Sequence, residues 1–161
     1  MKNLKDLFEH ELKDLYSAEK QLVDALPKMV QAASDQILQE AFSGHLEETK
    51  TQLQRIKEVC DELDVNPGNT KCDAMEGLIE ECEGMIKEDA ESDVKDAGLI
   101  ACAQRVEHYE ISGYGTAVRF AKELGYDAIA KKLQSTLDEE YNADNKLDKL
   151  AEGRLNNKAL A

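Results

Sequence analysis

Acidic side chains in the middle of otherwise apolar helical faces are the residues of this sequence best suited to chemistry. Between Leu38 and Leu63, apolar residues recur at helical spacing, yet His45, Glu48 and Gln52 fall on the same face. An ionised carboxylate on a buried helix face costs roughly several kcal/mol unless an opposite charge meets it. These side chains therefore require partners elsewhere in the chain.

Three other segments show the same pattern of apolar residues interrupted by acids. Glu19 interrupts an apolar face near the N-terminus, and Glu110 interrupts another past the middle of the chain, with Glu107 one turn before it. Glu140 and Asp144 interrupt a further face near the C-terminus. Four predicted helices are therefore apolar at both ends and acidic in the middle.

The spacing of these acids predicts that they lie at one level of a helical bundle. Antiparallel neighbours bring together residues that are equidistant from their shared turn. Glu19 and Glu48 are equidistant from the first predicted turn, and Glu110 and Glu140 are equidistant from the last one, at Gly125. If the two hairpins face each other, all four acids meet in the core.

Carboxylates that converge in a core cannot all stay ionised without cations, because neighbouring like charges raise each other's pKa. Two divalent metal ions would balance the four charges of Glu19, Glu48, Glu110 and Glu140. The remaining candidate ligands are His45, Asp144 and Glu107. Mixed carboxylate and imidazole ligation suits iron or manganese and is compatible with zinc.

Each candidate also has an alternative interpretation without a metal. The glutamates face solvent, as most glutamates do, if the apolar faces are displaced by one position. His45 then bonds a neighbouring carbonyl, and His108, which lies off the apolar face, has a surface role. Tyr16 and Tyr114, one turn from Glu19 and Glu110, either donate a hydrogen bond to a ligand carboxylate or pack in the core.

The elements that must position these residues are helices joined by short turns. Asp35, Ser92 or Asp93, and Asp127 are expected to cap three of the helices, and Gly125 is expected to adopt a left-handed conformation. A shorter helix after the break at 66–69 is expected to cross over between two hairpins. The predicted helices span residues 3–33, 36–63, 74–87, 94–124 and 128–153.

Composition supports a single all-α domain over residues 1–161. The chain has two prolines, and its formal net charge of −14 argues against nucleic acid or an anionic membrane as a partner. No secretory signal and no apolar stretch long enough to cross a bilayer is present, so we expect a cytoplasmic protein. The four cysteines lack metal-binding spacing and are expected to be buried or idle.

Four motifs stand out along the chain, at 16–22 (YSAEKQL), 45–49 (HLEET), 74–81 (AMEGLIEE) and 106–115 (VEHYEISGYG). They resemble those of the YciF-like bacterial stress proteins of the ferritin-like superfamily, and the resemblance covers nearly the whole chain. It implies a ferritin-like four-helix bundle with a short additional crossover helix, a homodimer, and kinship with rubrerythrins and dimanganese catalases.

The ligand pattern departs from that of the wider superfamily, in which Glu-x-x-His recurs. Here the order is His45-x-x-Glu48, and Glu140 is followed by Asp144 without a histidine. A site this poor in nitrogen favours Fe(III) or manganese.

Two classes of function follow from these residues. The first is a dimetal oxidoreductase, similar to a peroxidase or catalase, that acts on peroxide or dioxygen during stress, with Glu48 and Glu140 bridging the metals. The second is a metal-binding, sequestering or structural stress protein that turns nothing over. No catalytic side chain is assigned, and no nucleophile motif or phosphate loop suggests a different reaction.

Overall fold

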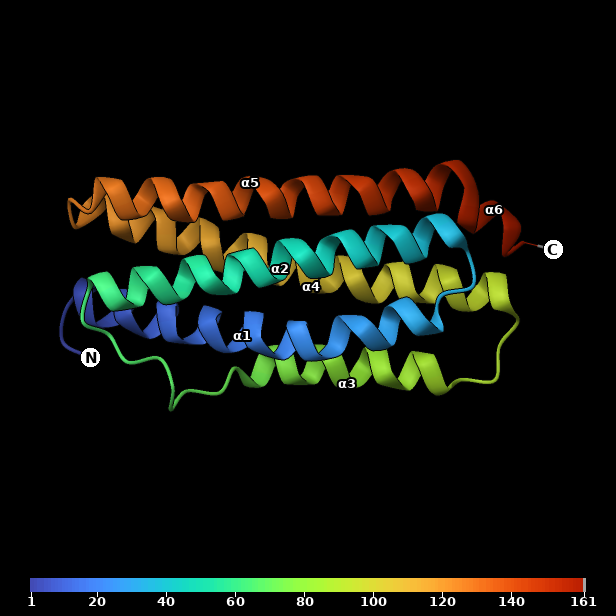
Figure 1. The fold of residues 1–161 in the computed structure, drawn as a ribbon, viewed down its shortest axis with the longest axis horizontal. Helices are drawn as coiled ribbons and strands as arrows, with labels where there is room; N and C mark the ends of the chain where they lie inside the picture. Colours follow the sequence, from blue (N-terminus) through green and yellow to red (C-terminus); the bar gives the residue numbers. More distant parts are fainter. Residues whose placement is uncertain (161) are drawn as a thin grey trace.

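Four long helices lie side by side along a common axis, and a shorter fifth helix lies outside them (Figure 1). The computed structural model describes residues 1–160, and no strand occurs within that range. The predicted all-α bundle with a short crossover helix is therefore confirmed. The helices are α1 (Leu4–Ala32), α2 (Gln36–Glu62), α3 (Asp73–Lys87), α4 (Ser92–Glu123) and α5 (Asp127–Leu150), followed by a π-helical turn, η1 (Ala151–Leu155), and α6 (Asn156–Lys158).

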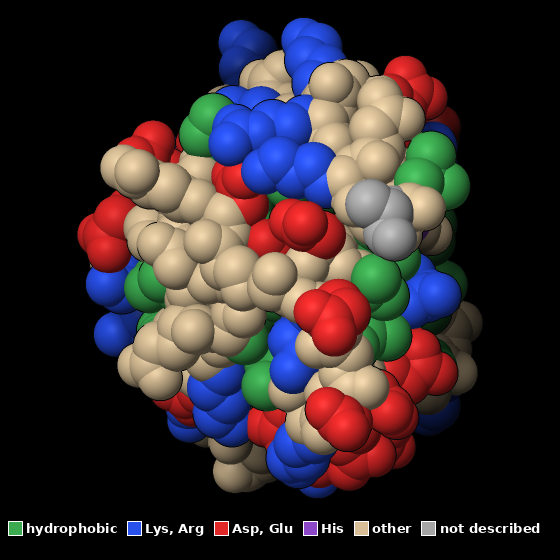
Figure 2. All heavy atoms as spheres, turned by 90° about the vertical axis from the view of Figure 1, so that its right-hand side faces the viewer, with side chains coloured by type: hydrophobic (Ala, Val, Ile, Leu, Met, Phe, Trp, Pro, Cys, Tyr) green, Lys and Arg blue, Asp and Glu red, His purple; other side chains and the backbone are tan. Residues whose placement is uncertain are grey.

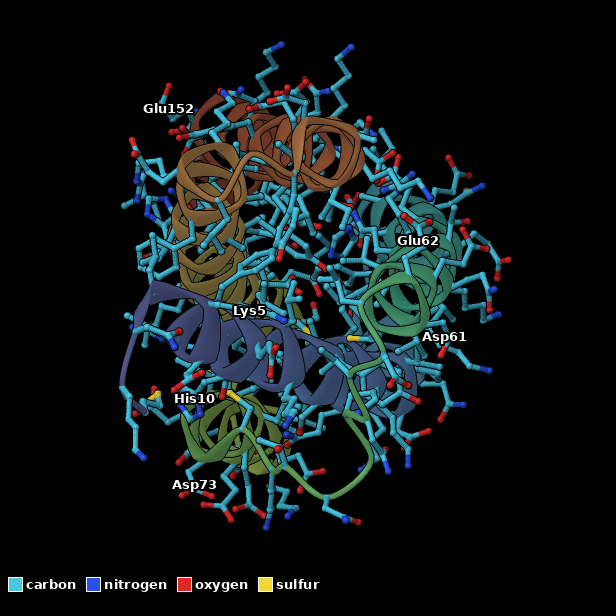
Figure 3. All side chains as sticks on the ribbon, turned by 90° about the vertical axis from the view of Figure 1, so that its left-hand side faces the viewer. Lys5, His10, Asp61, Glu62, Asp73 and Glu152 are labelled. Atoms are coloured by element: carbon cyan, nitrogen blue, oxygen red, sulfur yellow. The ribbon has the colours of Figure 1, made fainter. Side chains whose placement is uncertain are left out.

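The topology is two antiparallel hairpins joined by the crossover helix. Helix α1 pairs with α2, and α4 pairs with α5, while α1 also packs against α4 and α2 against α5. Because α3 carries the chain back along the bundle, α2 and α4 run in the same direction, as predicted (Figure 1). Seen along the bundle, α3 lies outside the square of long helices (Figure 3).

Two apolar clusters fill the bundle, one toward each end. Each cluster draws side chains from all four long helices. The stretch between them carries the buried acids, which confirms the expected pattern of apolar ends and a polar middle. The first cluster includes Leu22, Leu26, Leu38, Phe42, Leu99 and Leu147. The second includes Phe8, Leu12, Leu15, Ile56, Ala117 and Leu133.

The helix starts follow the sequence only in part. The Asp35 carboxylate accepts hydrogen bonds from the amides of Ile37 and Leu38 (3.0 and 3.3 Å), so the predicted cap of α2 is confirmed. Gly125 has a φ of 77°, as predicted.

The expected caps of α4 and α5 were wrong by one or two positions. Helix α4 begins at Ser92 with Glu91 as its N-cap, and α5 begins at Asp127 with Tyr126 as its N-cap. Neither cap residue makes a side-chain hydrogen bond, so tertiary packing sets these two starts rather than local capping. Asp127 instead lies in the first turn, where its charge favours the positive end of the helix dipole.

Polar contacts tie the C-terminus to the turn between α1 and α2. Asp35 forms ion pairs with Arg154 and Lys158 at 2.8 and 3.0 Å, and the carboxylate of Asp96 accepts from the amides of Ser34 and Asp35, both at 2.8 Å. Acidic and basic side chains are intermixed on this end of the molecule (Figure 2). Within residues 1–160, no helix has an apolar stretch that would cross a bilayer.

Candidate metal centre

Polar side chains from all four long helices are buried at the level between the two apolar clusters. The exposed fraction is 0% for Glu19, Glu110 and Glu140, 2% for Glu107 and 8% for His45. Glu19 lies on α1, His45 on α2, Glu107 and Glu110 on α4, and Glu140 on α5. Five of the seven predicted ligands therefore have buried side chains.

Four of these residues form a compact set of potential ligands. His45, Glu107, Glu110 and Glu140 each offer one ligand atom, and these atoms all lie within 4.8 Å of one another. The spacing of Glu107 and Glu110 is nearly one helical turn, so both project from one face of α4. One imidazole and three carboxylates from three helices thus converge on a common point.

The approach of His45 to Glu107 fits ligands of a shared ion. His45 Nε2 lies 3.1 Å from Glu107 Oε1, yet neither ring nitrogen meets the geometric criteria for a hydrogen bond. Two ligands about 2.1 Å from one metal ion, at right angles, stand about 3 Å apart. The separation therefore suits joint coordination, and it also permits an ion pair when the imidazole is protonated.

Unpaired oxygens are the clearest property of this cluster. Within residues 1–160, six buried carboxylate oxygens have no hydrogen-bond partner. Buried polar atoms are nearly always paired, because an unpaired one loses its hydration without compensation. A bound cation would compensate for this loss. The six atoms are Oε2 of Glu19, Oε2 of Glu107, and both oxygens of Glu110 and of Glu140.

The buried environment disfavours ionised carboxylates in the absence of a cation. Burial raises the pKa of Glu19 to about 8, although the hydrogen bond from Tyr114 opposes the shift. Burial and the repulsion of neighbouring carboxylates also raise the pKa of Glu110 and of Glu140 well above the ordinary range. These three carboxyl groups therefore hold a proton more tightly than ordinary glutamates do.

His45 responds in the opposite sense to the same neighbours. Burial alone would lower its pKa, but the carboxylates of Glu107, Glu48 and Glu140 outweigh burial and raise the pKa well above its ordinary value. The cluster therefore attracts positive charge to the imidazole as well.

Tyr114 is fully buried and donates a hydrogen bond of 2.5 Å to Glu19 Oε1. The sequence predicted either this role or core packing, and the recipient is the carboxylate on α1 rather than the nearer one in sequence, Glu110. Tyr16 instead packs against the second apolar cluster. The Tyr114 contact fixes one oxygen of Glu19 and leaves the other oxygen without a partner.

Glu48 lies outside the cluster, at its rim. Its side chain is 39% exposed and lies 3.7 Å from both His45 Nδ1 and Lys146 Nζ. The inner positions of α2 are taken by His45, Thr49 and Gln52, all of which are buried. Because Glu48 is displaced around the helix from this line, the structure does not bring it among the other acids.

Asp144 is likewise not brought into the cluster. Its carboxylate accepts from Gln104 Nε2 at 3.2 Å and lies 3.3 Å from His108 Nε2. His108 has a side chain that is 68% exposed, in line with its expected surface role. His10, labelled in Figure 3, is an exposed residue of α1.

A second polar layer on α2 and α5 was not identified as part of the site from the sequence. Arg55 donates two hydrogen bonds to Glu139, at 2.9 and 3.0 Å, and a third to Thr136 at 2.6 Å. Gln52, fully buried, donates to Glu139 at 3.1 Å while its own Oε1 has no partner. The sequence did contain a pattern that indicates this layer, because Gln52 interrupts the apolar face of α2 and Arg55 follows at helical spacing.

A small cavity adjoins the cluster. Its volume is about 30 Å³, and His45 and Glu107 form part of its wall. Glu48 and Lys146 also line it, and the other lining residues are apolar. A water molecule needs about 10–15 Å³ by the same measure, so the cavity suits a molecule of two or so heavy atoms.

The family model described as a domain of unknown function, DUF892, matches residues 3–160. The chain belongs to the DUF892 family. Protein YciF from Escherichia coli (strain K12) is 49% identical over 160 residues, which are 99% of this chain and 96% of that protein. The resemblance to YciF-like proteins that the sequence predicted is therefore confirmed.

Solved structures place this DUF892 chain among close structural relatives. The crystal structure of YciF, described as an Escherichia coli stress protein, has a TM-score of 0.91 and 50% identity, covering 94% of this chain and 96% of that one. A Rhodopseudomonas palustris protein, for which a structural role has been suggested, has a TM-score of 0.88 and 42% identity, covering 92% and 94%. A Xanthomonas campestris protein with 18% identity and a TM-score of 0.75 shares the fold; the matched regions cover 93% and 91%.

Proposed function

We propose that this chain binds two metal ions, iron or manganese, in the core of its bundle and acts on peroxide or dioxygen as a stress-response protein. The observation that carries the proposal is the set of six unpaired carboxylate oxygens at one level of the core. Protein cores of this size are otherwise filled by apolar side chains. Burying such a cluster of carboxylates without a cation costs free energy of folding.

The residues present fit a carboxylate-bound metal. His45, Glu107, Glu110 and Glu140 would hold one ion, and Glu19 would supply the fourth carboxylate that balances a second divalent ion. Zinc is also compatible with these ligands. Glu48, 3.7 Å from His45 Nδ1, stands where an outer carboxylate commonly accompanies a metal-bound histidine.

The remaining residues would bind and select the substrate. When bound, the metal ions would supply Lewis acidity and, for iron or manganese, electron transfer. The apolar wall of the adjoining cavity favours small uncharged molecules, and the cavity volume of about 30 Å³ excludes bulky ones. Tyr114 donates a hydrogen bond to Oε1 of Glu19. Oε2 of Glu19 has no hydrogen-bond donor and would be available to a metal ion.

A second candidate is a protein that binds or sequesters metal, or has only a structural role, without turnover. The relative from Rhodopseudomonas palustris for which a structural role has been suggested supports this candidate.

Metal reconstitution followed by peroxide exposure distinguishes the two. Full-length protein is stripped with a chelator, titrated in a calorimeter with Fe(II), Mn(II) or Zn(II), and analysed for bound metal. Hydrogen peroxide is then added while oxygen evolution and metal absorbance are recorded. Two bound redox ions with turnover support the enzyme, and bound metal without turnover supports sequestration. Protein that takes up no metal contradicts the metal centre altogether.

A paired substitution tests the ligand assignment. Glu110→Gln with Glu140→Gln should abolish metal uptake while helical content is retained, because the neutral amides fill the same space. Glu47→Gln is the matched control, since Glu47 lies on α2 beside Glu48 with a side chain that is 71% exposed. Metal uptake equal to that of the parent in the doubly substituted protein would overturn the assignment.

A further inference from the structure

Two cysteines outside the candidate metal centre face each other between α3 and α4. Cys82 and Cys102 are 5% and 4% exposed, and neither forms a disulfide. Cys82 lies on α3 and Cys102 on α4, and each thiol is the largest influence on the pKa of the other, so the two lie within interaction range. Neither residue belongs to the candidate ligands, so the proposed function leaves this pair unexplained.

The packing of the two helices accounts for the contact independently of the thiols. Helices α3 and α4 run antiparallel, and they approach so closely that a Cβ atom added to Gly98 would lie 2.5 Å from Met85 Sδ. One turn back along α3 from Met85 is Cys82, and one turn forward along α4 from Gly98 is Cys102. With Met85 opposite Gly98 in an antiparallel pair, Cys82 and Cys102 occupy facing positions one turn further along the interface.

A cation is in direct contact with the sulfur atom of Cys102. Arg105 Nη1 donates to Cys102 Sγ at 4.0 Å, and the arginine side chain is exposed to solvent. Within residues 1–160, Arg105 forms no ion pair with a carboxylate at 4.0 Å or less, although the charge of Glu81 acts against its effect on Cys102. The guanidinium thus stabilises a thiolate at Cys102 in preference to Cys82.

The two thiols differ in acidity in the same sense. The neighbouring Cys82 thiol is the largest influence and, with Arg105, lowers the pKa of Cys102 to about 7, against the effect of burial. The neighbouring Cys102 thiol and burial raise the pKa of Cys82. Burial also raises the pKa of the two other thiols, Cys60, to about 11, and Cys72. Cys102 is the most acidic thiol of the chain.

We propose that Cys82 and Cys102 form a peroxide-reactive dithiol that closes to a disulfide between α3 and α4. The Cys102 thiolate attacks one oxygen of hydrogen peroxide, so that an S–O bond forms, the O–O bond breaks and hydroxide leaves to take up a proton as water. Cys82 then attacks the resulting sulfenic acid, the S–S bond forms, and the oxygen leaves as a second water. Two thiols are oxidised and one peroxide is reduced.

This activity does not depend on the metal centre. It needs only peroxide as the oxidant, and its product is a covalent link between the crossover helix and the bundle. Failure of metal binding therefore leaves this proposal intact, and failure of disulfide formation leaves the metal centre intact.

Thiol mapping on the full chain, reduced and treated with chelator, tests the proposal. A small excess of hydrogen peroxide should remove two of the four free thiols, lower the intact mass by two hydrogen atoms and give one linked peptide pair containing Cys82 and Cys102. In Cys82→Ser, dimedone should trap a sulfenic acid at Cys102. Cys102→Ser should give neither product, and Cys60→Ser, another buried thiol, should behave like the parent.

Arg105→Gln provides a variant with both thiols intact. Alkylation of Cys102 by iodoacetamide at neutral pH should slow by roughly threefold or more, because the thiolate loses its neighbouring cation. Circular dichroism verifies that each variant is folded. If Cys102→Ser does not fold, the proposal is tested by the linked peptide pair in the parent and by dimedone labelling of Cys102 in Cys82→Ser. Oxidation of Cys60 or Cys72 ahead of the pair, or a parent that keeps four free thiols, would overturn the proposal.

Discussion

Glu110 has both carboxylate oxygens without a partner although its side chain is fully buried. Glu140 shares this property on the facing helix α5. A residue of this kind lowers the free energy of unfolding of the metal-free protein. A bound cation would compensate for this loss. At the residue scale, these carboxylates therefore lower the stability of the metal-free protein and raise its affinity for a metal ion.

Neutralising Glu110 should separate these two effects. In Glu110→Gln, the metal-free protein should gain about 1 kcal/mol or more of unfolding free energy at pH 8, because a buried group that resists ionisation is replaced by a neutral one. Metal affinity should fall at least about tenfold, since one charged ligand is lost. Urea unfolding and calorimetric titration measure the two quantities. Lower stability at pH 8 together with unchanged metal affinity would contradict this role for Glu110.

The stability of the metal-free protein should fall as the pH rises from about 4.5 toward about 8. Glu19 has a folded-state pKa of about 8 against an ordinary 4.5, so the folded state binds the proton more tightly than the unfolded state. Its contribution is present below the ordinary pKa and is lost as the pH passes through the raised value. His45, whose folded pKa is also raised, acts in the same direction.

Chemical unfolding of metal-free protein at a series of pH values measures this dependence. Glu19→Gln should flatten the curve between pH 5 and pH 8, because the titrating carboxyl is gone. Saturating metal should remove or reverse the slope, since deprotonated ligands bind the ion. A metal-free protein that becomes more stable over this range would contradict the pKa assignments.

The sequence correctly predicted which helices carry the acids. It predicted only in part which of these acids converge in the core. Glu19, Glu110 and Glu140 follow directly from interrupted apolar faces and are fully buried. Which side of its own helix Glu48 or Glu107 faces depended on the partner helices, because positions three or four apart share the broad face of a helix. Packing turns Glu107 inward and leaves Glu48 at the rim.

At the scale of elements, the periodic pattern set the helices to within a few residues, while the caps of α4 and α5 were missed. Their N-caps, Glu91 and Tyr126, make no side-chain hydrogen bond, so no local signal marked them. The start of α2 was predictable because Asp35 bonds the amides of the first turn. Local rules therefore predicted a start where a side chain makes the cap, and failed where packing alone sets it.

Asp35→Ala should destabilise the junction between the first hairpin and the C-terminus. It removes the cap of α2 and the ion pairs with Arg154 and Lys158, so we expect a loss of about 1–2 kcal/mol of unfolding free energy. Residues 151–160 should also exchange amide hydrogens faster. Thermal unfolding and hydrogen-exchange mass spectrometry measure these effects, with the exposed Asp89→Ala as control. Unchanged exchange at the C-terminus would show that these ion pairs do not hold it.

At the scale of the whole molecule, the formal charge of −14 is spread over a bundle that also concentrates acids in its core. Metal binding would offset part of this charge from inside, whereas salt acts mainly on the surface. The homodimer that the sequence predicts stays a prediction. Sedimentation equilibrium of the full chain should give twice the monomer mass, and a monomer at micromolar concentration would contradict it.

The charged layer between the two apolar clusters bears on how the bundle comes apart. Each half has its own hydrophobic interior, and the level that joins them contains six buried carboxylate oxygens without a hydrogen-bond partner. Metal-free protein should therefore open in two steps, with the amides of the two halves exchanging at distinct free energies. With iron or manganese bound, the bundle should open as one cooperative unit, because the metal would link the helices at the level between the two apolar clusters. Hydrogen-exchange mass spectrometry would reveal the change, and identical exchange profiles in both states would contradict it.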